Sequence, residues 1–569
     1  MALQKIADRV IDTDVLVVGG GIGGCPTAAK ATEHGLNVTL LEKSRLERSG
    51  KAGQGLDEVG IFPREGLTAL EAIKIYTGSG SAAARPGARA YVNPNALYRI
   101  FTRAMWALEE LERLGVNMRY TDGEYGWMPW GTGAGGRVGP RVELRVHWQN
   151  VKPEMAAGVK KKGVKVVERT TVVDLLTNKG KVVGATAINT RTGEFIVIKA
   201  KAVVLATGDL ERHYNSPTPL SWKYKMGLNT CPASSSGDGH AVAYRAGADL
   251  TCMEMMRPGT IRDILLLQPG QFYLNDGISA KVFTATGEET VLPPGPLDYL
   301  ELERKGLLPL YQTLEHLPDD FQKRLEIHFA DEAMIRLKLT ADRGFNPRTH
   351  RYQVTGDRAT RFNNTGIVID EDFMSSVPGL YGIGECTDTY GIGAGGTATA
   401  GFIVGDSIHQ YVSKAGEPVP DEAQVESQKQ AAMAPLTVKD GVEPMELECS
   451  VRQICEDYGG TYKSEGRLRE GLRRLGSLRR EFLPRLMAAN PHYVGRCLEA
   501  RNIMDLAELH LLASLGRKET RGLYVMLDHL QKDPSLDNKR ICQRLEKGKA
   551  VLEVRDIPEI KPEYIKENR

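Results

Sequence analysis

The stretch that decides the fold reads DVLVVGGGIGG at residues 14–24. Its apolar, valine-rich start is typical of a short parallel strand buried on both faces. The glycines that follow fit the spacing G-x-G-x-x-G at Gly19, Gly21 and Gly24. In that spacing the first glycine permits a tight turn, the second lets the backbone approach a pyrophosphate, and the third lets a helix pack on the strand. The segment therefore predicts a turn built for a dinucleotide.

The segments after the glycine turn follow the order that a dinucleotide-binding unit requires. A helix is expected through 28–33, and a second strand over 37–41 ends in Glu42. An acid about twenty residues after the turn is placed to accept hydrogen bonds from a ribose. Because strand, helix, second strand and acid occur in order, dinucleotide binding is favoured over a purely structural glycine turn.

Three more glycine-rich turns follow, at 50–55, 206–208 and 382–401. Turns spread this widely suit one extended ligand, FAD, better than NAD; the alternative is that they are unrelated. No second strand–G-x-G-x-x-G–helix–acid unit is found, which argues against direct use of NAD(P)H.

The composition is that of an ordinary globular protein of several domains. The chain has 569 residues, of which 41% are hydrophobic and 26% charged. The 74 basic and 72 acidic side chains leave a formal charge of +2, so the bulk charge gives no reason to expect nucleic acid or an anionic membrane as partner. Glycine is over-represented, with 61 residues, and the four turns account for much of that excess.

The eight cysteines form no C-x-x-C pair or other tight ligand cluster. The sequence therefore predicts no iron-sulfur cluster, no zinc site of the usual spacing and no other metal site in this chain. The wide cysteine spacing favours a reducing compartment. Because neither a signal-peptide-like start nor a long apolar stretch occurs, a cytoplasmic protein without transmembrane segments is expected.

Several segments resemble the flavoprotein subunits of the fumarate reductase, succinate dehydrogenase and L-aspartate oxidase family. They are SGDGH at 236–240 with AGADL at 246–250, and LAEL at 506–509 with RKETRG at 517–522. Within this family the chain resembles the alpha subunit of adenylylsulfate reductase in the segments 47–56, 147–153 and 517–521. The resemblance covers nearly the whole chain.

The chain also departs from the family pattern. The region 55–60 lacks the histidine that carries flavin covalently in succinate and fumarate enzymes, so FAD is expected to be noncovalent. The segment 253–260 lacks the family's substrate histidine, and Gly395-Gly396 stands in the region of its catalytic arginine. These differences argue against fumarate or succinate as substrate. The adenylylsulfate pattern is incomplete too, since Gly60 replaces an asparagine and 352–357 lacks a histidine.

The resemblance implies an α/β fold in which a Rossmann-like FAD-binding domain, residues 1–245 and 351–425, is interrupted by an α+β capping domain at 246–350. A helical C-terminal domain follows at 426–569. Prolines and short helical patterns at 290–320 favour an irregular lid over a sheet strand. Leucine spacing predicts an amphipathic helix over 464–489, whose arginines form a solvated face or a docking surface.

The residues expected to contact FAD come from all four turns and from the segments that the resemblance adds. They are Gly19, Gly21, Gly24, Glu42, Lys43, Ser49, Gly50, Gln54, Gly55, Val172, Ala206, Thr207, Gly208, Asp238, Glu385, Thr397 and Ala398.

Two residues are candidates for catalysis. Arg262 is the best match to the substrate-side arginine that the resemblance implies, where it would neutralise an anionic substrate or a developing negative charge. A structural ion pair of Arg262 with Asp263 or Glu254 is an equal alternative. His147 is suited to donate a proton near neutral pH, although a neutral histidine within the fold explains it equally well.

The leading hypothesis is an FAD-dependent catalytic subunit acting on a small anionic substrate, with a sulfur compound as one option. Because this chain has no cysteine cluster, the resemblance implies a ferredoxin-like iron-sulfur beta subunit as electron carrier, and so a hetero-oligomer. The alternatives are a fumarate-reductase-like desaturase of another C=C substrate and a noncatalytic flavin electron-transfer subunit.

Overall fold

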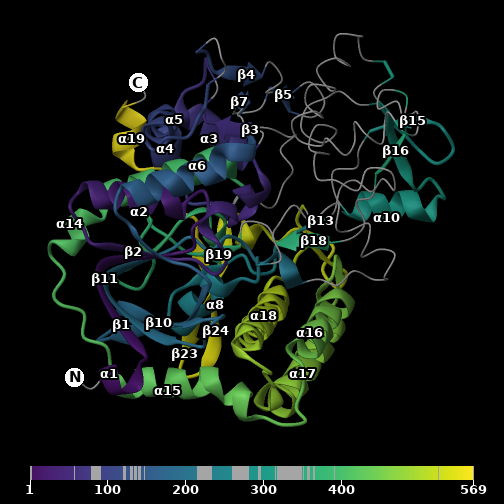
Figure 1. Cartoon of the computed structure of the whole chain (residues 1–569). Coiled ribbons are helices and arrows are strands. Elements are labelled where there is room, and N and C mark those ends of the chain that lie inside the picture. Colours follow the sequence, from purple (N-terminus) through teal and green to yellow (C-terminus); the bar gives the residue numbers. More distant parts are fainter. Residues whose placement is uncertain are drawn as a thin grey trace.

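A seven-stranded sheet forms the centre of the computed structural model (Figure 1). The structure describes residues 3–56, 58–63, 65–78, 91–119, 123–128, 132–133, 137–138, 142–145, 148–213, 234–258, 281–291, 296–313, 315–316, 342, 349, 351–354, 359–362, 365–389, 391–522 and 524–567. The strand order is β8-β2-β1-β11-β10-β9, with β20 added beside β11. The strands are β1 (Arg9–Val18), β2 (Val38–Leu41), β8 (Lys165–Val167), β9 (Thr170–Asn178), β10 (Lys181–Asn189), β11 (Phe195–Leu205) and β20 (Leu380–Gly382).

The strands that carry the predicted turns are parallel. β1 pairs in parallel with β2 and with β11, and β20 pairs in parallel with the end of β11. Val15 to Val18 are buried on both faces of the sheet, as expected for a parallel strand covered by helices. The carboxyl ends of these strands therefore meet at one edge, which is where open α/β sheets bind ligands.

Two helices distant in sequence cover this edge in close contact. They are α2 (Gly24–Glu33) and α13 (Gly393–Ser407). The Thr27 hydroxyl lies 3.0 Å from the carbonyl oxygen of Gly23 and 3.1 Å from that of Gly401. A side chain at Gly401 would overlap the Gly23 carbonyl, so the glycine is what allows the two helices to approach.

The other helices of this part are short and lie mostly on the α2 side of the sheet in Figure 1. They are α3 (Ala69–Thr77), α4 (Pro94–Phe101), α5 (Ala104–Arg113) and α6 (Trp148–Lys161). On the opposite side, α15 (Glu422–Met433) lies against β9 and β10, where Gln428 bonds the Thr186 hydroxyl and the Leu175 carbonyl.

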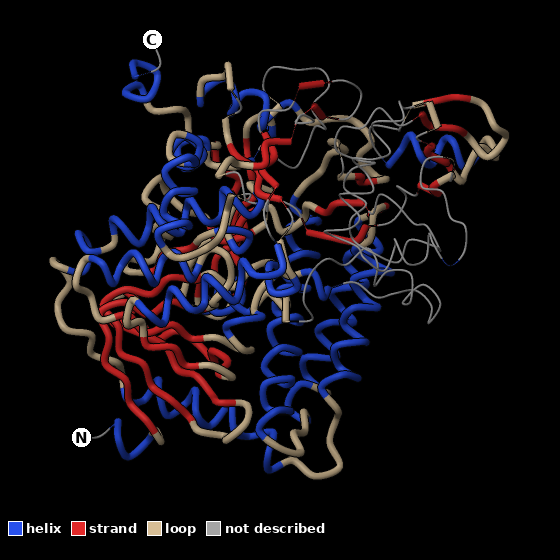
Figure 2. The backbone as a smooth tube through the Cα atoms, turned by 45° about the horizontal axis from the view of Figure 1, so that its top comes forward, coloured by secondary structure: helices blue, strands red, loops and turns tan. Residues whose placement is uncertain are grey.

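The C-terminal part is built on three helices that stand together beside the sheet (Figure 2). They are α16 (Pro444–Gly459), α17 (Glu465–Glu481) and α18 (Pro491–Gly516). The expected helix over 464–489 is too long, because α17 ends at Glu481 and a separate short helix follows at Leu483–Arg485. Pro484 explains the break, since proline has no N–H for the helical ladder.

A hairpin after α18 packs against the first part of the chain. Its strands β23 (Lys539–Glu546) and β24 (Lys549–Asp556) extend a small sheet with β12 (Leu250–Thr251) and β19 (Gly366–Ile367). The helix α19 (Pro562–Glu567) lies beside α4, where the Tyr98 hydroxyl donates to Glu567 at 3.0 Å.

A separate small unit lies away from the sheet in Figure 1. It contains a four-stranded antiparallel sheet and the helix α10 (Pro296–Arg304), and its own core includes Val282, Tyr299 and Leu310. Its strands are β14 (Lys281–Phe283), β15 (Glu289–Thr290), β16 (Leu310–Thr313) and β17 (Tyr352–Val354). The expectation that 290–320 holds no strand is therefore wrong at β16, whose pairing with β14 and β17 is nonlocal. The boundaries at 245, 350 and 425 stay predictions.

No helix within the described residues is long and apolar enough to cross a membrane.

Candidate functional site

The turn after β1 has the geometry that its glycines predict. Gly19 has φ +100°, and a side chain there would overlap the Ala206 carbonyl. A side chain at Gly24 would overlap the Gly19 carbonyl, so Gly24 allows α2 to begin directly against the turn. By contrast, the nearest atom to the side-chain position of Gly21 is the Gly50 Cα at 4.0 Å. The side-chain position of Gly21 is thus open, which is compatible with a pyrophosphate approaching the first turn of α2.

Glu42 at the end of β2 holds this turn. One carboxylate oxygen accepts a hydrogen bond from the Gly20 N–H at 2.7 Å, and the other accepts from the Ser44 N–H at 2.7 Å and its hydroxyl at 2.9 Å. A carboxylate can accept about four hydrogen bonds, so a bond from a ribose is compatible with these contacts. That role stays a prediction.

The second glycine turn packs directly on the first. The Ser49 hydroxyl lies 2.9 Å from the Gly20 carbonyl oxygen and 3.1 Å from that of Leu46. Gly50, with φ +69°, faces Gly21. Gln54 ends the short helix η2 (Lys51–Gln54), its side chain lying outside the described residues, and Gly55 follows with φ +124°.

The turn after β11 completes the edge of the sheet. The Ala206 N–H bonds the Val18 carbonyl at 2.8 Å, and Gly239 at the start of α8 (Asp238–Arg245) lies against the Thr207 hydroxyl. Gly208 has φ +72°. Val172 is buried in β9, whose first residue bonds the Glu42 carbonyl.

The fourth turn, at 382–401, reaches the same place from a part of the chain far from the first turn in sequence. The Thr397 methyl group lies beside Gly23 and Gly384, and Ala398 is buried next to it in α13. Glu385, in the short helix η5 (Gly384–Cys386), pairs with Lys51 at 2.6 Å. Lys51 also pairs with Asp209 at 2.5 Å, so one lysine links the second, third and fourth turns.

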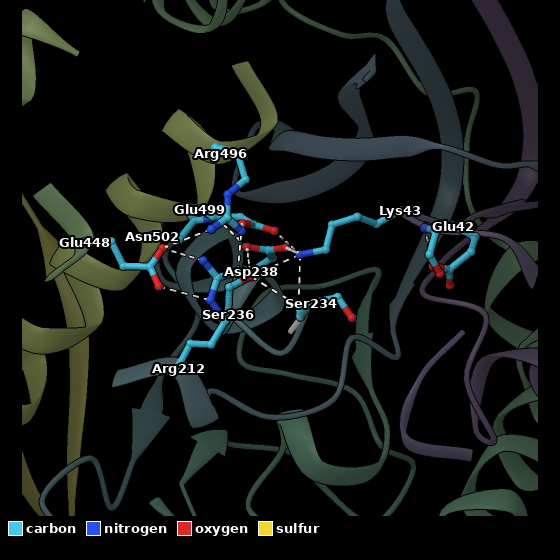
Figure 3. Close-up of polar contacts among 11 residues, drawn as sticks. Glu42, Lys43, Arg212, Ser234, Ser236, Asp238, Glu448, Arg496, Glu499 and Asn502 are labelled. Carbon is cyan, nitrogen blue, oxygen red and sulfur yellow. Dashed lines mark hydrogen bonds and ion pairs between the residues drawn. The ribbon is translucent and has the colours of Figure 1, made fainter. Parts of the chain in front are cut away.

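Lys43 and Asp238 belong to a buried ionic network, which we call the Lys43 network (Figure 3). The Lys43 ammonium lies 2.7 Å from Asp238 and 2.9 Å from Glu499, and also contacts the Ser234 carbonyl and the Ser236 hydroxyl. Figure 3 shows its side chain reaching away from Glu42. The remaining members are Arg212, Glu448, Arg496 and Asn502.

The charges in this network hold each other ionised. Burial alone would raise the pKa of Glu499, but Lys43, Arg212 and Arg496 outweigh it and lower that pKa to about 2. Burial would likewise lower the pKa of Lys43, yet Asp238 and Glu499 raise it. The network ties the end of β2 to α8 and α18. A direct contact of Lys43 or Asp238 with FAD stays a prediction.

A second buried ionic cluster contains the arginine of the 517–522 segment. Arg517 donates to Glu254 at 2.8 Å and to Glu519 at 2.7 Å, and all three side chains are fully buried. Lys463 lies close by, and its burial lowers its pKa to about 7 although Glu254 acts in the opposite direction. Glu254, one alternative partner of Arg262, is thus engaged by Arg517.

Asp388 is a further buried acid near the fourth turn. It follows η5 and pairs with Arg540 of β23. Burial raises its pKa to about 6, with Arg540 opposing the shift. Sequence reasoning missed Asp388, Arg540 and most of the Lys43 network because their partners lie far along the chain.

The two catalytic candidates, His147 and Arg262, lie outside the described residues. Within the described part, no group of three His, Cys, Asp or Glu side chains is arranged to hold a metal ion. What the structure does bring together is four glycine-rich turns at the carboxyl ends of β1, β2, β11 and β20. Gly21 is open and the surrounding polar groups are fixed, which fits an extended dinucleotide.

Comparisons with known proteins agree with this site. The sequence profile of the FAD binding domain matches residues 14–258, and that of the fumarate reductase flavoprotein C-terminal region matches residues 449–558. Among curated relatives, an L-aspartate oxidase of Streptomyces coelicolor is 24% identical over 97% of this chain and 95% of its own length.

Solved structures share the whole fold. An adenosine-5-phosphosulfate reductase in complex with sulfite superposes with a TM-score of 0.81 at 22% identity, covering 97% of this chain and 96% of its own. The FrdA subunit of E. coli quinol fumarate reductase gives 0.76 at 18% identity, covering 97% and 98%. The chain is an FAD-dependent oxidoreductase and belongs to the succinate dehydrogenase and fumarate reductase flavoprotein family.

Proposed function

We propose that this chain is the catalytic flavoprotein subunit of a complex, and that it exchanges electrons between a small anionic substrate and a separate iron-sulfur subunit. The observation that carries the proposal is the cysteine spacing. FAD supplies two-electron chemistry at its ring and can pass electrons on singly. The eight cysteines form no cluster-binding pattern, so we assign the next one-electron carrier to another chain.

The described residues supply the binding part of this function. The turn at Gly19 to Gly24 presents its backbone to the diphosphate, and Glu42 orients that turn. Lys51 holds the turns at Asp209 and Glu385 in fixed positions. The chain's own contribution is therefore a rigid, preorganised seat for a noncovalent cofactor.

We assign the substrate side to the capping domain at 246–350, with Arg262 neutralising the substrate's charge and His147 as proton donor. The proposal of a sulfur oxyanion is supported by sequence. The segment 253–260 lacks the histidine typical of fumarate and succinate enzymes, while three segments resemble adenylylsulfate reductase. Reduction of adenylylsulfate takes up two electrons and releases sulfite and AMP.

The test is purification of the chain from its native host under gentle conditions, followed by flavin and iron analysis. We expect one FAD for each copy, iron in the preparation, and a second, smaller polypeptide that contains it. Adenylylsulfate should reoxidise the reduced flavin, and sulfite should bleach the visible absorbance of the oxidised flavin. A preparation with FAD, no iron and no second polypeptide contradicts the partner proposal.

A variant connects the substrate proposal to one residue. Arg262→Gln should raise KM for adenylylsulfate and leave the FAD content unchanged. Arg473→Gln, an exposed change on α17, is the matched control and should leave both unchanged. If Arg262→Gln has unaltered kinetics, the structural role of this arginine is the correct one.

L-Aspartate oxidation is the second candidate, because a whole-length curated relative is an L-aspartate oxidase. The same preparation separates the two. Flavin reduction by L-aspartate, with no response to adenylylsulfate or sulfite, would replace the sulfur proposal. Reoxidation by fumarate alone would favour a fumarate-reductase-like desaturase, and no response to any substrate would favour a noncatalytic flavin subunit.

A further inference from the structure

Lys152 is a fully buried lysine without an acidic partner. It lies in α6, and its relative exposure is 0%. Its ammonium donates to the Leu46 carbonyl oxygen at 2.6 Å and lies 3.6 Å from the Cys25 sulfur. Among the described residues no carboxylate lies within 4.0 Å of this ammonium. Both of its contacts are neutral groups, so its charge is not compensated by an ion pair.

Both contacts lead to the turn at Gly19 to Gly24. The Cys25 thiol donates to the Gly20 carbonyl oxygen at 3.1 Å, and Cys25 stands in the first turn of α2. The Leu46 carbonyl also lies 3.1 Å from the Ser49 hydroxyl, which in turn contacts Gly20. Lys152 is therefore located behind the turn, one side chain away from its backbone.

The other lysines around this site are paired. Lys43 contacts two carboxylates, and so does Lys51. Lys160, two turns further along α6, pairs with Glu47 at the surface. Lys152 differs from all three in being buried without such a partner.

Glu42 is the acid that faces the same region. Its carboxylate is bonded to Gly20 and Ser44 and makes no ion pair with Lys152. Burial raises the pKa of the Cys25 thiol, while the charge of Lys152 lowers it and that of Glu42 raises it. A diphosphate placed against the Gly21 backbone would bring two negative charges into this region of low dielectric.

We propose that Lys152 is the internal countercharge for the diphosphate of the bound dinucleotide, acting through the turn without touching the ligand. A buried charge is costly unless an opposite charge compensates it. Water is excluded behind the turn, so the attraction is poorly screened and extends over several ångströms. Lys152 thus raises the affinity for ligands that carry a diphosphate over that for ligands that lack one. The proposal depends on FAD binding and not on the identity of the substrate.

The test compares two neutral substitutions in the full-length protein freed of FAD. Lys152→Met removes both the charge and the hydrogen bond to Leu46, whereas Lys152→Gln removes the charge and keeps an amide donor on a slightly shorter side chain. If charge is what matters, both variants should bind FAD and ADP roughly 10- to 100-fold more weakly. Adenosine, which lacks the diphosphate, should bind them as it binds the wild type.

The stability of the FAD-free protein separates this role from a structural one. A buried charge without its anion destabilises the folded protein. Both neutral variants should therefore unfold at the same or higher denaturant concentration than the wild type when FAD is absent. Lys152→Arg should retain the preference for ADP over adenosine. Lys160→Met is the matched control on the same helix and should change neither affinity.

Three results would overturn the proposal. The first is equal weakening of ADP and adenosine, and the second is full ADP affinity in Lys152→Gln. The third is failure of both neutral variants to fold without FAD, because the ammonium would then be needed by the fold itself. Titration of the wild type with FAD is a separate check, since its failure would count against cofactor binding and not against Lys152 alone.

Discussion

Lys43 and Lys152 flank the same turn, but their surroundings are opposite. Lys43 follows Glu42 after the end of β2, and its ammonium lies 2.7 Å from Asp238 and 2.9 Å from Glu499. Lys152 lies behind the turn, with a carbonyl oxygen and a thiol as its neighbours. The charge of Lys43 is compensated by carboxylates of the protein, whereas we propose that the charge of Lys152 is compensated by the ligand. The comparison teaches that the role of a lysine near a glycine-rich turn depends on whether carboxylates surround it, not on its distance from the glycines.

The largest expected effect comes from breaking the Lys43 network. Lys43→Met leaves Asp238 and Glu499 without their lysine in a buried site, and should lower the free energy of unfolding by about 3–5 kcal/mol. Chemical denaturation measures this. The double variant Lys43→Met, Glu499→Gln should lose less than the sum of the two single variants, because they share one interaction. Additive losses would show that Lys43 and Glu499 do not stabilise each other.

The turn between the two lysines gives the second prediction. Gly24→Ala would place a side chain on the Gly19 carbonyl, so it should cost ~3 kcal/mol of stability and abolish FAD binding. Gly466→Ala on α17 is the matched control, because nothing lies within 4 Å of its side-chain position. It should stabilise the protein by about 0.5 kcal/mol. Retained FAD in Gly24→Ala would contradict the assignment of this turn.

His240 adds a third case to the comparison of the two lysines. It is a buried titratable group that stays neutral and makes no ion pair with any residue that the structure describes. Burial lowers the pKa of His240 to about 4. Between pH 6.5 and 4 the unfolded chain binds a proton at this residue and the folded chain does not, so stability falls as the pH falls. The loss should be about 2 kcal/mol at pH 5.

Denaturation curves at pH 7 and pH 5 for the wild type and His240→Gln check this prediction. The variant should lose less stability between the two pH values than the wild type does. An equal loss in both proteins would mean that His240 is not the group responsible.

The smallest effect is expected on the outer face of α17. Arg473 pairs with Glu470 at 2.7 Å, and its side chain is mostly exposed. Arg473→Gln should change stability by less than ~0.5 kcal/mol, and added salt should remove even that difference. A larger loss of stability would indicate that a partner covers the outer face of α17 in the sample that is measured.

How much the sequence could predict depended on how local each interaction is. The turn at Gly19 to Gly24 was predictable, because its chemistry is set by neighbours within a few residues. The ending of α17 was not, because leucine spacing continues past Pro484 while the hydrogen-bond ladder does not. The strand β16 was missed since only its pairing with β14 and β17 makes it a strand.

Side-chain roles were the least predictable part of the site. The contact of Lys43 and Asp238 with the cofactor stays a prediction, and their partner Glu499 could not be foreseen because it is 456 residues from Lys43 in sequence. Lys152 gave no signal of its own, because a lysine in an amphipathic helix usually points to solvent. Its significance comes from the packing of α6 against α2 and the turn.

The pairing of β20 with β11 also has a consequence for how the protein is made. Val203 to Leu205 pair with residues 380–382, so this apolar strand edge is bare while the ribosome makes the intervening residues. An unpaired apolar edge is a site for aggregation or for a chaperone. The predicted cofactor site is complete only after α13 has been synthesised, and Glu499, which pairs with Lys43, is synthesised later still. We therefore expect FAD to bind only after most of the chain has been synthesised.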